Sequence, residues 1–296
     1  MNNILILIVN FCDYKMTETC VNQLIKITVK ADILIIDNKS PNSSYEYLSQ
    51  KYQEFENIRV IQSEKNGGYS YGNNFGIRSV DNEKYDFYCI MNPDVILESD
   101  YLNEICDKIN LYDDVASVST LMFLNGNFQS DAITWKLPIG KAIYKEHFLL
   151  NRKKINNCVC KQFKDSLVDA EVLPGSFFLI KKNCFNKIKF FDENAFLYNE
   201  ENIIGFKLRN ANLKQVIDTS HYYIHNHKNR DRKSIIKNYK SNFKNILLNY
   251  KAGYESRKYL CSAYLNNKYH IRLVLVNLLN LLILHVKHFF SFFYYF

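Results

Sequence analysis

The sequence predicts an α/β protein, with a mostly parallel sheet flanked by helices and a helical extension at its C-terminus. Apolar runs of strand length alternate with segments of helical spacing over about the first 120 residues. The apolar runs are continuous rather than alternating, which is typical of strands buried on both faces of a sheet. Repeated strand–helix units of this kind join parallel strands through right-handed crossovers.

The strands and helices of this series follow one another at regular intervals. Strands are expected at Ile4–Val9, Ile33–Ile36, Ile58–Ile61, Phe87–Met91 and Val115–Thr120. Helices are expected at Thr17–Ile27, Ser43–Tyr52, Tyr69–Val80 and Tyr101–Ile109. The first apolar run is too short for a secretory signal, and no Lys or Arg precedes it, so it indicates a buried strand.

The part of the chain from residue 121 to residue 230 is less regular. Residues 121–170 carry no assignable pattern. Beyond them, a strand is expected at Val172–Ile180, a helix at Glu200–Ala211, and short strands at Lys214–Ile217 and Tyr222–Ile224. These elements complete a first domain over residues 1–230.

Residues 231–296 are expected to form a helical extension. Helices rich in Lys, Tyr and Asn are expected at Lys233–Tyr250 and Ser256–Asn266, and a strongly apolar helix at Ile271–Phe296. On the last helix, a narrow polar stripe is formed by Asn277, Asn280 and Lys287. The stretch without Lys or Arg is 14 residues long, short of the roughly 18–20 that span a bilayer. We therefore expect this helix to lie on a membrane surface, with packing on the domain as the alternative.

The composition restricts the compartment and the partners. A net charge of +8 fits anionic partners, which include nucleic acid, nucleoside diphosphates and an anionic membrane. Nucleic acid is not expected, because the positive charge is spread out and no recognised nucleic-acid module appears. The eight cysteines are scattered, and Cys158 and Cys160 have no second pair to complete a zinc site. They indicate buried, reduced thiols in a cytoplasmic protein.

Polar residues follow the predicted strands at the point where each strand ends. They are Asn10 and Asp13, Asp37-Asn38-Lys39-Ser40, Asn66-Gly67-Gly68, and Asn92-Pro93-Asp94. In open parallel sheets, ligands bind beyond the carboxyl ends of the strands. Asp and Asn also form turns and helix caps, so one such cluster alone is a weak signal. Their repetition at consecutive strand ends predicts a nucleotide-binding site.

The segment from Asn66 to Gly76 is rich in glycine, although the whole chain has only nine glycines. It matches neither a Walker loop nor a dinucleotide fingerprint. Gly72 and Gly76 lie four residues apart, on one face of the expected helix, and Asn73 lies between them. Glycine at these positions lets the helix approach a ligand or a neighbouring backbone closely, and close packing alone is the alternative.

Acidic residues and histidines are the candidates for chemistry. Asp94 follows a buried strand and a proline, where a carboxylate either holds Mg²⁺ or Mn²⁺ or belongs to an ordinary loop. Glu200 and Glu201 begin a predicted helix, where they either suit the helix dipole or act as a desolvated base. Three histidines at positions 221, 225 and 227 lie on one side of an extended segment, and one of them is a candidate metal ligand.

Taken in order, these motifs resemble the family 2 glycosyltransferases of the GT-A fold, especially the rhamnosyltransferase-like bacterial members that build surface polysaccharides such as capsule and lipopolysaccharide. The resemblance covers about residues 4–230. The segments that carry it are Ile8-Val-Asn10-Phe, Ile35-Ile-Asp37-Asn38-Lys-Ser40, the glycine-rich segment, Met91-Asn92-Pro-Asp94, Pro174-Gly175-Ser-Phe-Phe, Phe191-Asp-Glu193, Phe196-Leu-Tyr-Asn-Glu200-Glu201 and Tyr223-Ile-His225. Each segment is weakly specific alone, and their order and spacing together are strong.

The resemblance implies an inverting transfer from a UDP-, dTDP- or GDP-linked sugar to a glycan or a polyprenyl-linked acceptor. It implies that Asp37 binds the base and ribose, that Asp94 and His225 hold a divalent cation (Mg²⁺ or Mn²⁺), and that Glu201 deprotonates the acceptor. Glu200 is the second choice for the base. The implied donor site also includes Asn10, Asn38, Asn66, Gly67, Gly68, Gly72, Asn73 and Asn92. The chain departs from the family pattern at Asn92, which replaces the first acid of the metal motif, and at Glu201, which replaces Asp.

Two further functions stay open from the sequence. A sugar nucleotidyltransferase has a similar core, but such proteins carry a Gly-rich, basic loop after the first strand, where this chain reads Asn10-Phe-Cys-Asp13. A nucleotide-sugar or glycan-binding module without catalysis is disfavoured, because the acids and His225 of the site are all retained. The basic segment Lys233–Lys251 and the apolar tail favour a peripheral protein at the inner face of the cell membrane.

Overall fold

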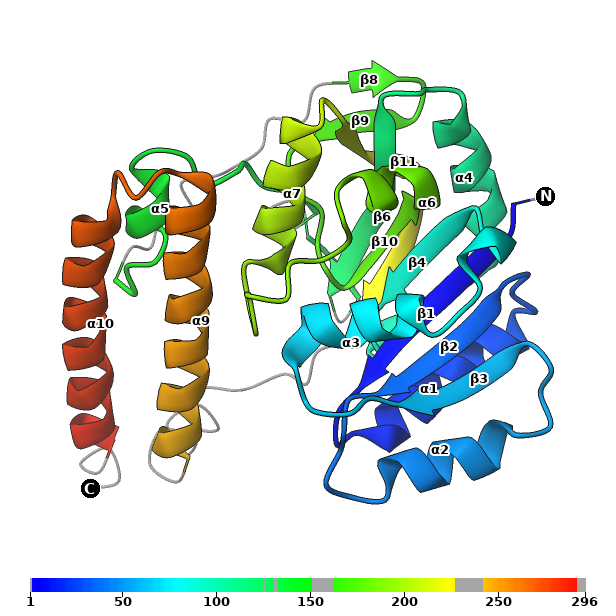
Figure 1. Ribbon diagram of the computed structural model, residues 1–296, viewed down its shortest axis with the longest axis horizontal. Helices are drawn as coiled ribbons and strands as arrows, with labels where there is room; N and C mark the ends of the chain where they lie inside the picture. The colour runs from blue at the N-terminus through cyan, green and yellow to red at the C-terminus, as the bar shows by residue number, and fades with distance from the viewer. Residues whose placement is uncertain (1, 125, 130–132, 151–161, 227–241, 292–296) are drawn as a thin grey trace. The chain divides into compact units, whose positions relative to one another are not determined.

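The computed structural model describes residues 2–124, 126–129, 133–150, 162–226 and 242–291 (Figure 1). The chain divides into two compact units. The first, here called the sheet unit, comprises Met1–Leu137, Cys158–Glu193 and Glu200–His227, and the second, the helical unit, comprises Pro138–Asn157, Asn194–Asn199 and Lys228–Phe296. Two segments that the sequence analysis places in the first domain therefore group with the C-terminal helices.

The sheet unit is built on one sheet, in which 11 strands are found among the described residues. In chain order they are β1 (Ile4–Asn10), β2 (Asp32–Asp37), β3 (Ile58–Gln62), β4 (Phe87–Met91), β5 (Val95–Ile96), β6 (Val115–Leu124), β7 (Asn127–Phe128), β8 (Gln162–Lys164), β9 (Leu167–Ala170), β10 (Phe177–Lys181) and β11 (Lys214–His225). Their order in the sheet is β3-β2-β1-β4-β10-β6-β11-β9-β8, with β5 paired to β11 and β7 paired to β6. The five strands expected in the first part of the chain are all present.

The directions of the strands decide which residues meet. β1 to β4 are parallel to one another, whereas β10 is antiparallel to both β4 and β6, and β11 is parallel to β6. The carboxyl ends of β1 to β4, β6 and β11 therefore lie with the amino end of β10 along one edge, which we call the carboxyl edge. The α/β class is confirmed, and the sheet is parallel over β1 to β4 and mixed from β10 onward.

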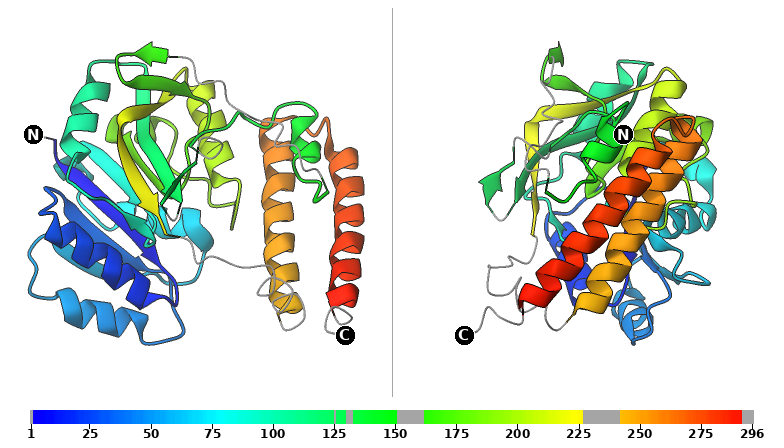
Figure 2. Two further views of the ribbon diagram at one scale, coloured as in Figure 1. Left: turned by 180° about the vertical axis from the view of Figure 1, so that it is seen from behind. Right: turned by 90° about the vertical axis from the view of Figure 1, so that its left-hand side faces the viewer.

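Helices cover both faces of the sheet (Figure 2). One face carries α1 (Tyr14–Lys26), α2 (Ser44–Tyr52) and α4 (Leu102–Asn110), and the other carries α3 (Gly68–Arg78), α6 (Lys182–Lys187) and α7 (Glu200–Asn210). Along β1, Ile4 and Ile6 belong to the core on the first face, and Leu5 and Leu7 belong to the core on the second. Because both faces are buried, the strand has no polar side, which explains its continuous apolar sequence.

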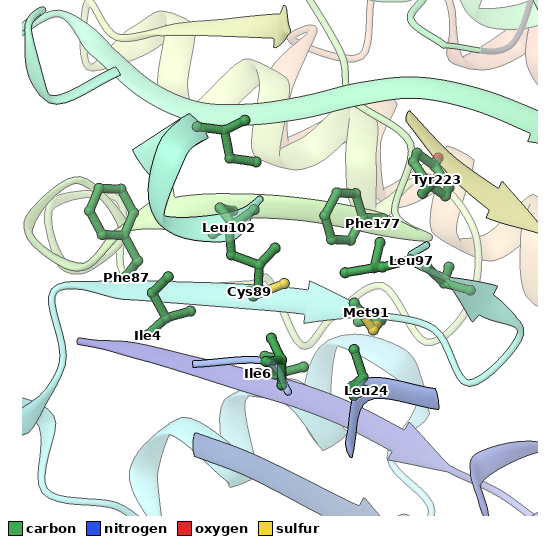
Figure 3. Close-up of a cluster of buried hydrophobic side chains, with 14 of the residues drawn as sticks. Ile4, Ile6, Leu24, Phe87, Cys89, Met91, Leu97, Leu102, Phe177 and Tyr223 are labelled. Atoms are coloured by element: carbon green, nitrogen blue, oxygen red, sulfur yellow. The ribbon is translucent and has the colours of Figure 1, made fainter. Parts of the chain in front are cut away.

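Figure 3 shows the core on the first face, where β1, β4 and β10 meet α1 and α4. In this core, Met91 of β4 lies beside Leu24 of α1, and Cys89 of β4 lies beside Leu102 of α4. The thiol of Cys20 is 3.8 Å from the Met91 sulfur, and burial raises the pKa of this thiol to about 12. Cys20 and Cys89 are therefore inert apolar side chains, as the sequence predicts.

Beyond residue 171, the observed strands differ from the expected ones. The strand expected at Val172–Ile180 begins only at Phe177, because Pro174 has no N–H to donate within a central strand. Val172 forms an isolated bridge with Trp135 instead. The two short strands expected after residue 213 are one continuous strand, β11, which has an irregular register between Asp218 and Tyr222.

In the helical unit, α9 (Phe243–Tyr264) and α10 (His270–Ser291) lie side by side, and α5 (Ala142–Lys145) packs on α10 (Figures 1 and 2). The expected break between residues 250 and 256 is wrong, because α9 continues through it. Gly253 within α9 gives room to the ring of Tyr198, which would lie 3.0 Å from a Cβ at that position. Residues 233–241 and 292–296 of the expected helices lie outside the described residues.

Candidate functional site

The carboxyl edge gathers polar side chains from several strands. Asn10 ends β1 and lies in register with Asp37, which ends β2. Asn92 follows β4, and its backbone N–H donates to the carbonyl of Ser176 at 2.8 Å, just before β10 begins. His225 ends β11, where it is in register with Val95 of β5. Residues from distant parts of the sequence therefore border one another at this edge.

Asp37 is the centre of a buried hydrogen-bond network and has no exposed surface. Its Oδ1 accepts a bond from Asn10 Nδ2 at 2.8 Å, and its Oδ2 accepts bonds from the Ser40 N–H at 2.9 Å and from Gln62 Nε2 at 3.1 Å. The Oδ1 of Asn10 in turn accepts a bond from the Thr17 hydroxyl at 2.9 Å. Three donors stabilise the buried carboxylate. Asp37 therefore holds the ends of β1, β2 and β3 in place relative to one another.

Replacing Asp37 with Ala is expected to lower the free energy of unfolding by about 2–4 kcal/mol, because three buried donors lose their acceptor together. Urea unfolding at neutral pH, followed by circular dichroism, measures this change. Asp113→Ala removes an exposed carboxylate of the same unit and is expected to change stability by less than about 0.5 kcal/mol. Equal stability of the Asp37→Ala protein and the wild type would mean that the network is not needed for the fold.

The glycine-rich segment begins α3 at the same edge. Asn38 Nδ2 donates to Asn66 Oδ1 at 3.1 Å and to the Gly68 carbonyl at 3.0 Å. Gly68 has a φ of 84°, in the left-handed region that favours glycine. A Cβ on Gly67 would lie 2.3 Å from the side chain of Tyr71. These residues shape the N-terminus of α3, where backbone N–H groups and the helix dipole favour an anion.

The other glycines of α3 pack against the sheet. A Cβ on Gly72 would lie 3.0 Å from Val9, and a Cβ on Gly76 would lie 2.9 Å from Ile36. Close packing therefore accounts for both glycines. Asn73 donates to the Tyr69 carbonyl at 3.0 Å, and its buried Oδ1 has no hydrogen-bond partner among the described residues.

Asp94 and His225 form a pair at the middle of the carboxyl edge. His225 Nε2 lies 3.1 Å from Asp94 Oδ1, and the side chains are 10% and 14% exposed. The pairing of β5 with β11 brings them together. A carboxylate oxygen and an imidazole nitrogen are ligands that Mn²⁺ and Mg²⁺ accept, so the donor set fits such a cation. Among the residues that the structure describes, no three or more His, Cys, Asp or Glu side chains are placed so that they could hold a metal ion together, so bound substrate or water would supply the other ligands.

His221 is not part of this pair. The ring of His221 stacks on Tyr101 at a centroid distance of 4.6 Å, and its Nδ1 lies 2.7 Å from Asp218 Oδ2. The register of β11 is irregular between Asp218 and Tyr222 and regular from Tyr222 to His225. His221 therefore does not share the alternation of side chains between the two faces of the strand that holds from Tyr222 to His225. His227 lies outside the described residues.

Glu200 and Glu201 begin α7 directly after two residues with a left-handed backbone, Tyr198 (φ 66°) and Asn199 (φ 67°). Burial raises the pKa of the Glu201 carboxyl, although the backbone N–H groups of Glu201 and Gly175 donate to it. Burial, with the neighbouring charge of Glu201, raises the pKa of Glu200 well above its ordinary value. Glu200 Oε2 is buried without a hydrogen-bond partner among the described residues. The two carboxyl groups therefore bind protons more readily than exposed glutamates.

Gly175 gives Glu201 its position. A Cβ on Gly175 would lie 2.8 Å from Glu201 Oε1, so a side chain here would displace the carboxylate. The hydroxyl of Tyr69 donates to the Gly175 carbonyl at 2.6 Å. The next residue, Ser176, forms a 2.9 Å hydrogen bond between its hydroxyl and that of Tyr223. Tyr69, Gly175 and Ser176 therefore link the acids of α7 to β10 and to the Asp94 region.

The raised pKa of Glu200 predicts a pH-dependent loss of stability. The folded protein holds this proton more tightly than the unfolded chain, so the favourable contribution is full below the unfolded pKa and is lost as pH rises through the folded pKa. Glu200→Gln is therefore expected to be more stable than the wild type at pH near 7.5, by about 1.4 kcal/mol for each unit of the shift, and equal to it near pH 4. Urea unfolding at both pH values measures this difference.

The matched control for this experiment is Glu56→Gln, which removes an exposed carboxylate. Its stability is expected to follow that of the wild type at both pH values, within about 0.5 kcal/mol. If Glu200→Gln also followed the wild type, Glu200 would not be a desolvated carboxyl group.

A cavity of about 660 Å³ lies away from these residues, at the other end of α7. Lys136, Asp169, Arg209 and Lys214 are among the residues that line it. Lys214 begins β11, whereas His225 ends it, so the cavity lies toward the opposite edge of the sheet. It contains none of the site residues expected from the sequence.

Comparisons with known proteins show the family to which the chain belongs. The model of the family described as Glycosyl transferase family 2 matches residues 5–173. The chain is 26% identical to the low-salt glycan biosynthesis hexosyltransferase Agl10 of Haloferax volcanii over 227 residues, which cover 75% of this chain and 67% of that protein.

Two solved structures have a similar fold. One is GalNAc-T7 with UDP, GalNAc and Mn²⁺, with a TM-score of 0.61 and 14% identity over 77% of this chain and 44% of that chain. The other is S. aureus TarS 1-349, with a TM-score of 0.52 and 13% identity over 90% of this chain and 74% of that chain. The matched region thus spans less than half of the GalNAc-T7 chain.

Proposed function

Because the chain belongs to glycosyl transferase family 2, we propose that this glycosyltransferase moves a sugar, with inversion, from a nucleoside-diphosphate donor to a hydroxyl group of a glycan or a polyprenyl-linked oligosaccharide. The observation that carries the proposal is the arrangement of the carboxyl edge. The Asp37 network lies at the ends of β1, β2 and β3, the Asp94–His225 pair lies where β4 and β11 end, and Glu201, at the start of α7, lies beside Gly175.

The donor nucleotide would bind along the ends of β1 and β2 and at the N-terminus of α3. Asn10, Asp37 and Asn38 would face the base and ribose, with Asp37 acting chiefly by holding its neighbours, since three protein donors already occupy it. Asn66, Gly67 and Gly68 would present backbone N–H groups to the diphosphate. The proposed donor-binding residues also include Asn92 and Asn73. Asn73 Oδ1 is a buried acceptor without a hydrogen-bond partner among the described residues.

Asp94 and His225 would hold a divalent cation, Mn²⁺ or Mg²⁺, together with the diphosphate. Such a cation neutralises the charge that develops on the leaving diphosphate. Asn92 adds no negative charge to this site, so the protein contributes one carboxylate and one imidazole.

Glu201 would act as the general base. It would take the proton of the acceptor hydroxyl while the acceptor oxygen bonds to the anomeric carbon, opposite the breaking bond to the diphosphate. The electrons of that bond leave with the nucleoside diphosphate. A carboxylate whose pKa is raised by burial is a stronger base than an exposed one, and the missing Cβ of Gly175 leaves it room. Glu200 is the second candidate for this role.

The donor sugar would be a hexose or a deoxyhexose, in the synthesis of a surface glycan. The name of Agl10, a hexosyltransferase of glycan biosynthesis, supports a hexosyl donor. Asn92 before Asp94 supports the rhamnosyltransferase-like alternative, because that branch shares the replacement. We place the reaction in the cytoplasm, at the inner face of the cell membrane, where nucleotide sugars and polyprenyl-linked acceptors meet.

Ligand-induced thermal stabilisation tests the donor site without an acceptor. The full chain would be heated with UDP, dTDP or GDP, each with and without MnCl₂. One nucleoside diphosphate is expected to raise Tm by several degrees, because it binds only the folded state, and Mn²⁺ is expected to enlarge this rise. Asp94→Ala should abolish the part that depends on Mn²⁺. If no nucleoside diphosphate raised Tm, the proposed donor site would be wrong.

A further inference from the structure

The apolar side of α10 is exposed over the length of the helix. Six large apolar residues are each between 51% and 62% exposed: Leu275, Leu278, Leu279, Leu282, Phe289 and Phe290. By length and composition alone the helix also qualifies as a membrane span, with a mean hydropathy of 1.8 and only 17% of its apolar window buried. A helix of a water-soluble domain turns such a face toward its core.

The polar side of α10 is turned inward instead. Asn280 has no exposed surface, its Nδ2 donates to the His147 carbonyl at 2.7 Å, and its Oδ1 accepts from the Leu149 N–H at 2.9 Å. Asn277 Oδ1 accepts a bond from the Tyr250 hydroxyl of α9 at 2.8 Å. Within its own unit, the helix therefore buries its polar side and exposes its apolar side. Its hydrogen bonds fix the polar stripe toward α9 and residues 147–149, and so fix the apolar face outward.

The positive charge of the chain is concentrated in the C-terminal part of the sequence, which includes this helix. Residues 228–296 contain 13 Lys and Arg and 2 Asp and Glu, a net charge of +11, so the first 227 residues carry −3 of the total of +8. No Asp or Glu occurs after Glu255. Arg272 and Lys287, near the two ends of α10, are exposed. An apolar face bordered by positive charge is complementary to an anionic lipid surface, whereas a second copy of this strongly positive region would be repelled.

The positions of these charges also decide between lying on a bilayer and crossing it. Arg272 and Lys287 are 15 residues apart, a helical distance of about 22 Å, whereas the apolar core of a bilayer is about 30 Å thick. The buried side of the helix keeps its protein partners through Asn277 and Asn280. We propose that α10 lies in the plane of an anionic membrane surface, with its exposed leucines and phenylalanines inserted among the lipids.

This inference rests on the proposed function and names the helix and the lipid surface that would hold the transferase at the membrane. Its test measures lipid binding alone, so each can fail without the other. The full chain would be sedimented with vesicles of phosphatidylcholine, with or without phosphatidylglycerol. Binding is expected to need phosphatidylglycerol and to weaken in salt of about 0.5 M, because screening reduces the attraction of Lys and Arg for the surface. The variant Leu275→Glu/Leu278→Glu/Leu282→Glu is expected to lose at least about tenfold in affinity.

The matched control is Phe55→Glu/Leu111→Glu/Phe128→Glu, which replaces three exposed apolar residues of the sheet unit and changes the net charge equally. It should bind as the wild type does, and thermal unfolding would establish that both triple variants are folded. Equal losses in the two triple variants would reduce the effect to net charge and overturn the proposal. So would a wild type that ignores both vesicles, or one that sediments in solution as a dimer which the α10 variant dissociates.

Discussion

Replacing Glu201 with Gln is expected to lower kcat for sugar transfer by about 10²–10⁴-fold while the affinity for the donor nucleotide stays unchanged. Gln is nearly isosteric with Glu and fits the space left by Gly175, but it takes no proton from the acceptor. Release of nucleoside diphosphate at saturating donor and acceptor measures kcat, and thermal stabilisation by the nucleotide measures binding.

The pH profile makes this prediction specific to a base. Because burial raises the pKa of Glu201, the acid limb of kcat/KM in the wild type should lie above the ordinary range of a glutamate, and Glu201→Gln should lack this limb. Glu56→Gln, at an exposed position, is the control and should keep both rate and profile. If Glu201→Gln retained transfer while Glu200→Gln lost it, the base would be Glu200.

Asp94→Ala is expected to lower kcat/KM by at least about 10²-fold and to remove any stimulation by Mn²⁺, because it deletes the single carboxylate of the proposed cation site. His225→Ala should cause a smaller loss that higher Mn²⁺ concentrations partly restore, since the carboxylate remains. Titration of nucleoside diphosphate release with MnCl₂ measures both effects.

Asp113→Ala, which removes an exposed aspartate from the same unit, serves as the control and should respond to Mn²⁺ as the wild type does. An Asp94→Ala protein with the same Mn²⁺ response as the wild type would exclude Asp94 as a ligand. The diphosphate would then be held by positively charged side chains instead of a cation.

The N-terminal half of the fold was predictable because its signals are local. Ile33–Ile36 and Phe87–Met91 are short apolar runs, and each is followed by polar residues and then by a helical pattern. Burial on both faces makes such runs continuous, so periodicity and length suffice to recognise them. β10 was misjudged at its start because Val172 and Leu173 are also apolar, whereas the hydrogen bonding of the strand begins only at Phe177.

The grouping of the candidate site residues at one edge of the sheet was predictable where these residues follow strands. Position alone identifies the polar residues that follow the parallel strands, because parallel strands end at one edge of the sheet. These residues are Asn10, Asp37, Asn92 and Asp94. Gln62, Tyr69, Ser176 and Tyr223 were missed, since their roles depend on partners far away in the sequence. The one available signal was Pro174-Gly175, a glycine in a chain with few of them.

The orientation of α10 shows a different limit. Spacing alone identifies the stripe of Asn277 and Asn280, but it does not say whether that stripe faces water or protein. The answer depends on His147 and Tyr250, whose groups meet the two asparagines only after folding. The spacing therefore predicted a helix with one polar and one apolar face. Hydrogen bonds to distant residues determine which of the two faces is exposed.

The central claim, that this chain transfers sugar from a nucleotide donor at the carboxyl edge, is tested most directly by release of nucleoside diphosphate. UDP-, dTDP- and GDP-linked hexoses and deoxyhexoses would be incubated with the wild type, Glu201→Gln and Asp94→Ala, with Mn²⁺ or Mg²⁺ and a polyprenyl-linked glycan extract as acceptor. The account predicts release from one donor by the wild type, nearly absent in both variants. A donor that binds without release under any of these conditions would identify a non-catalytic binding module, and release that survives in both variants would place the chemistry elsewhere.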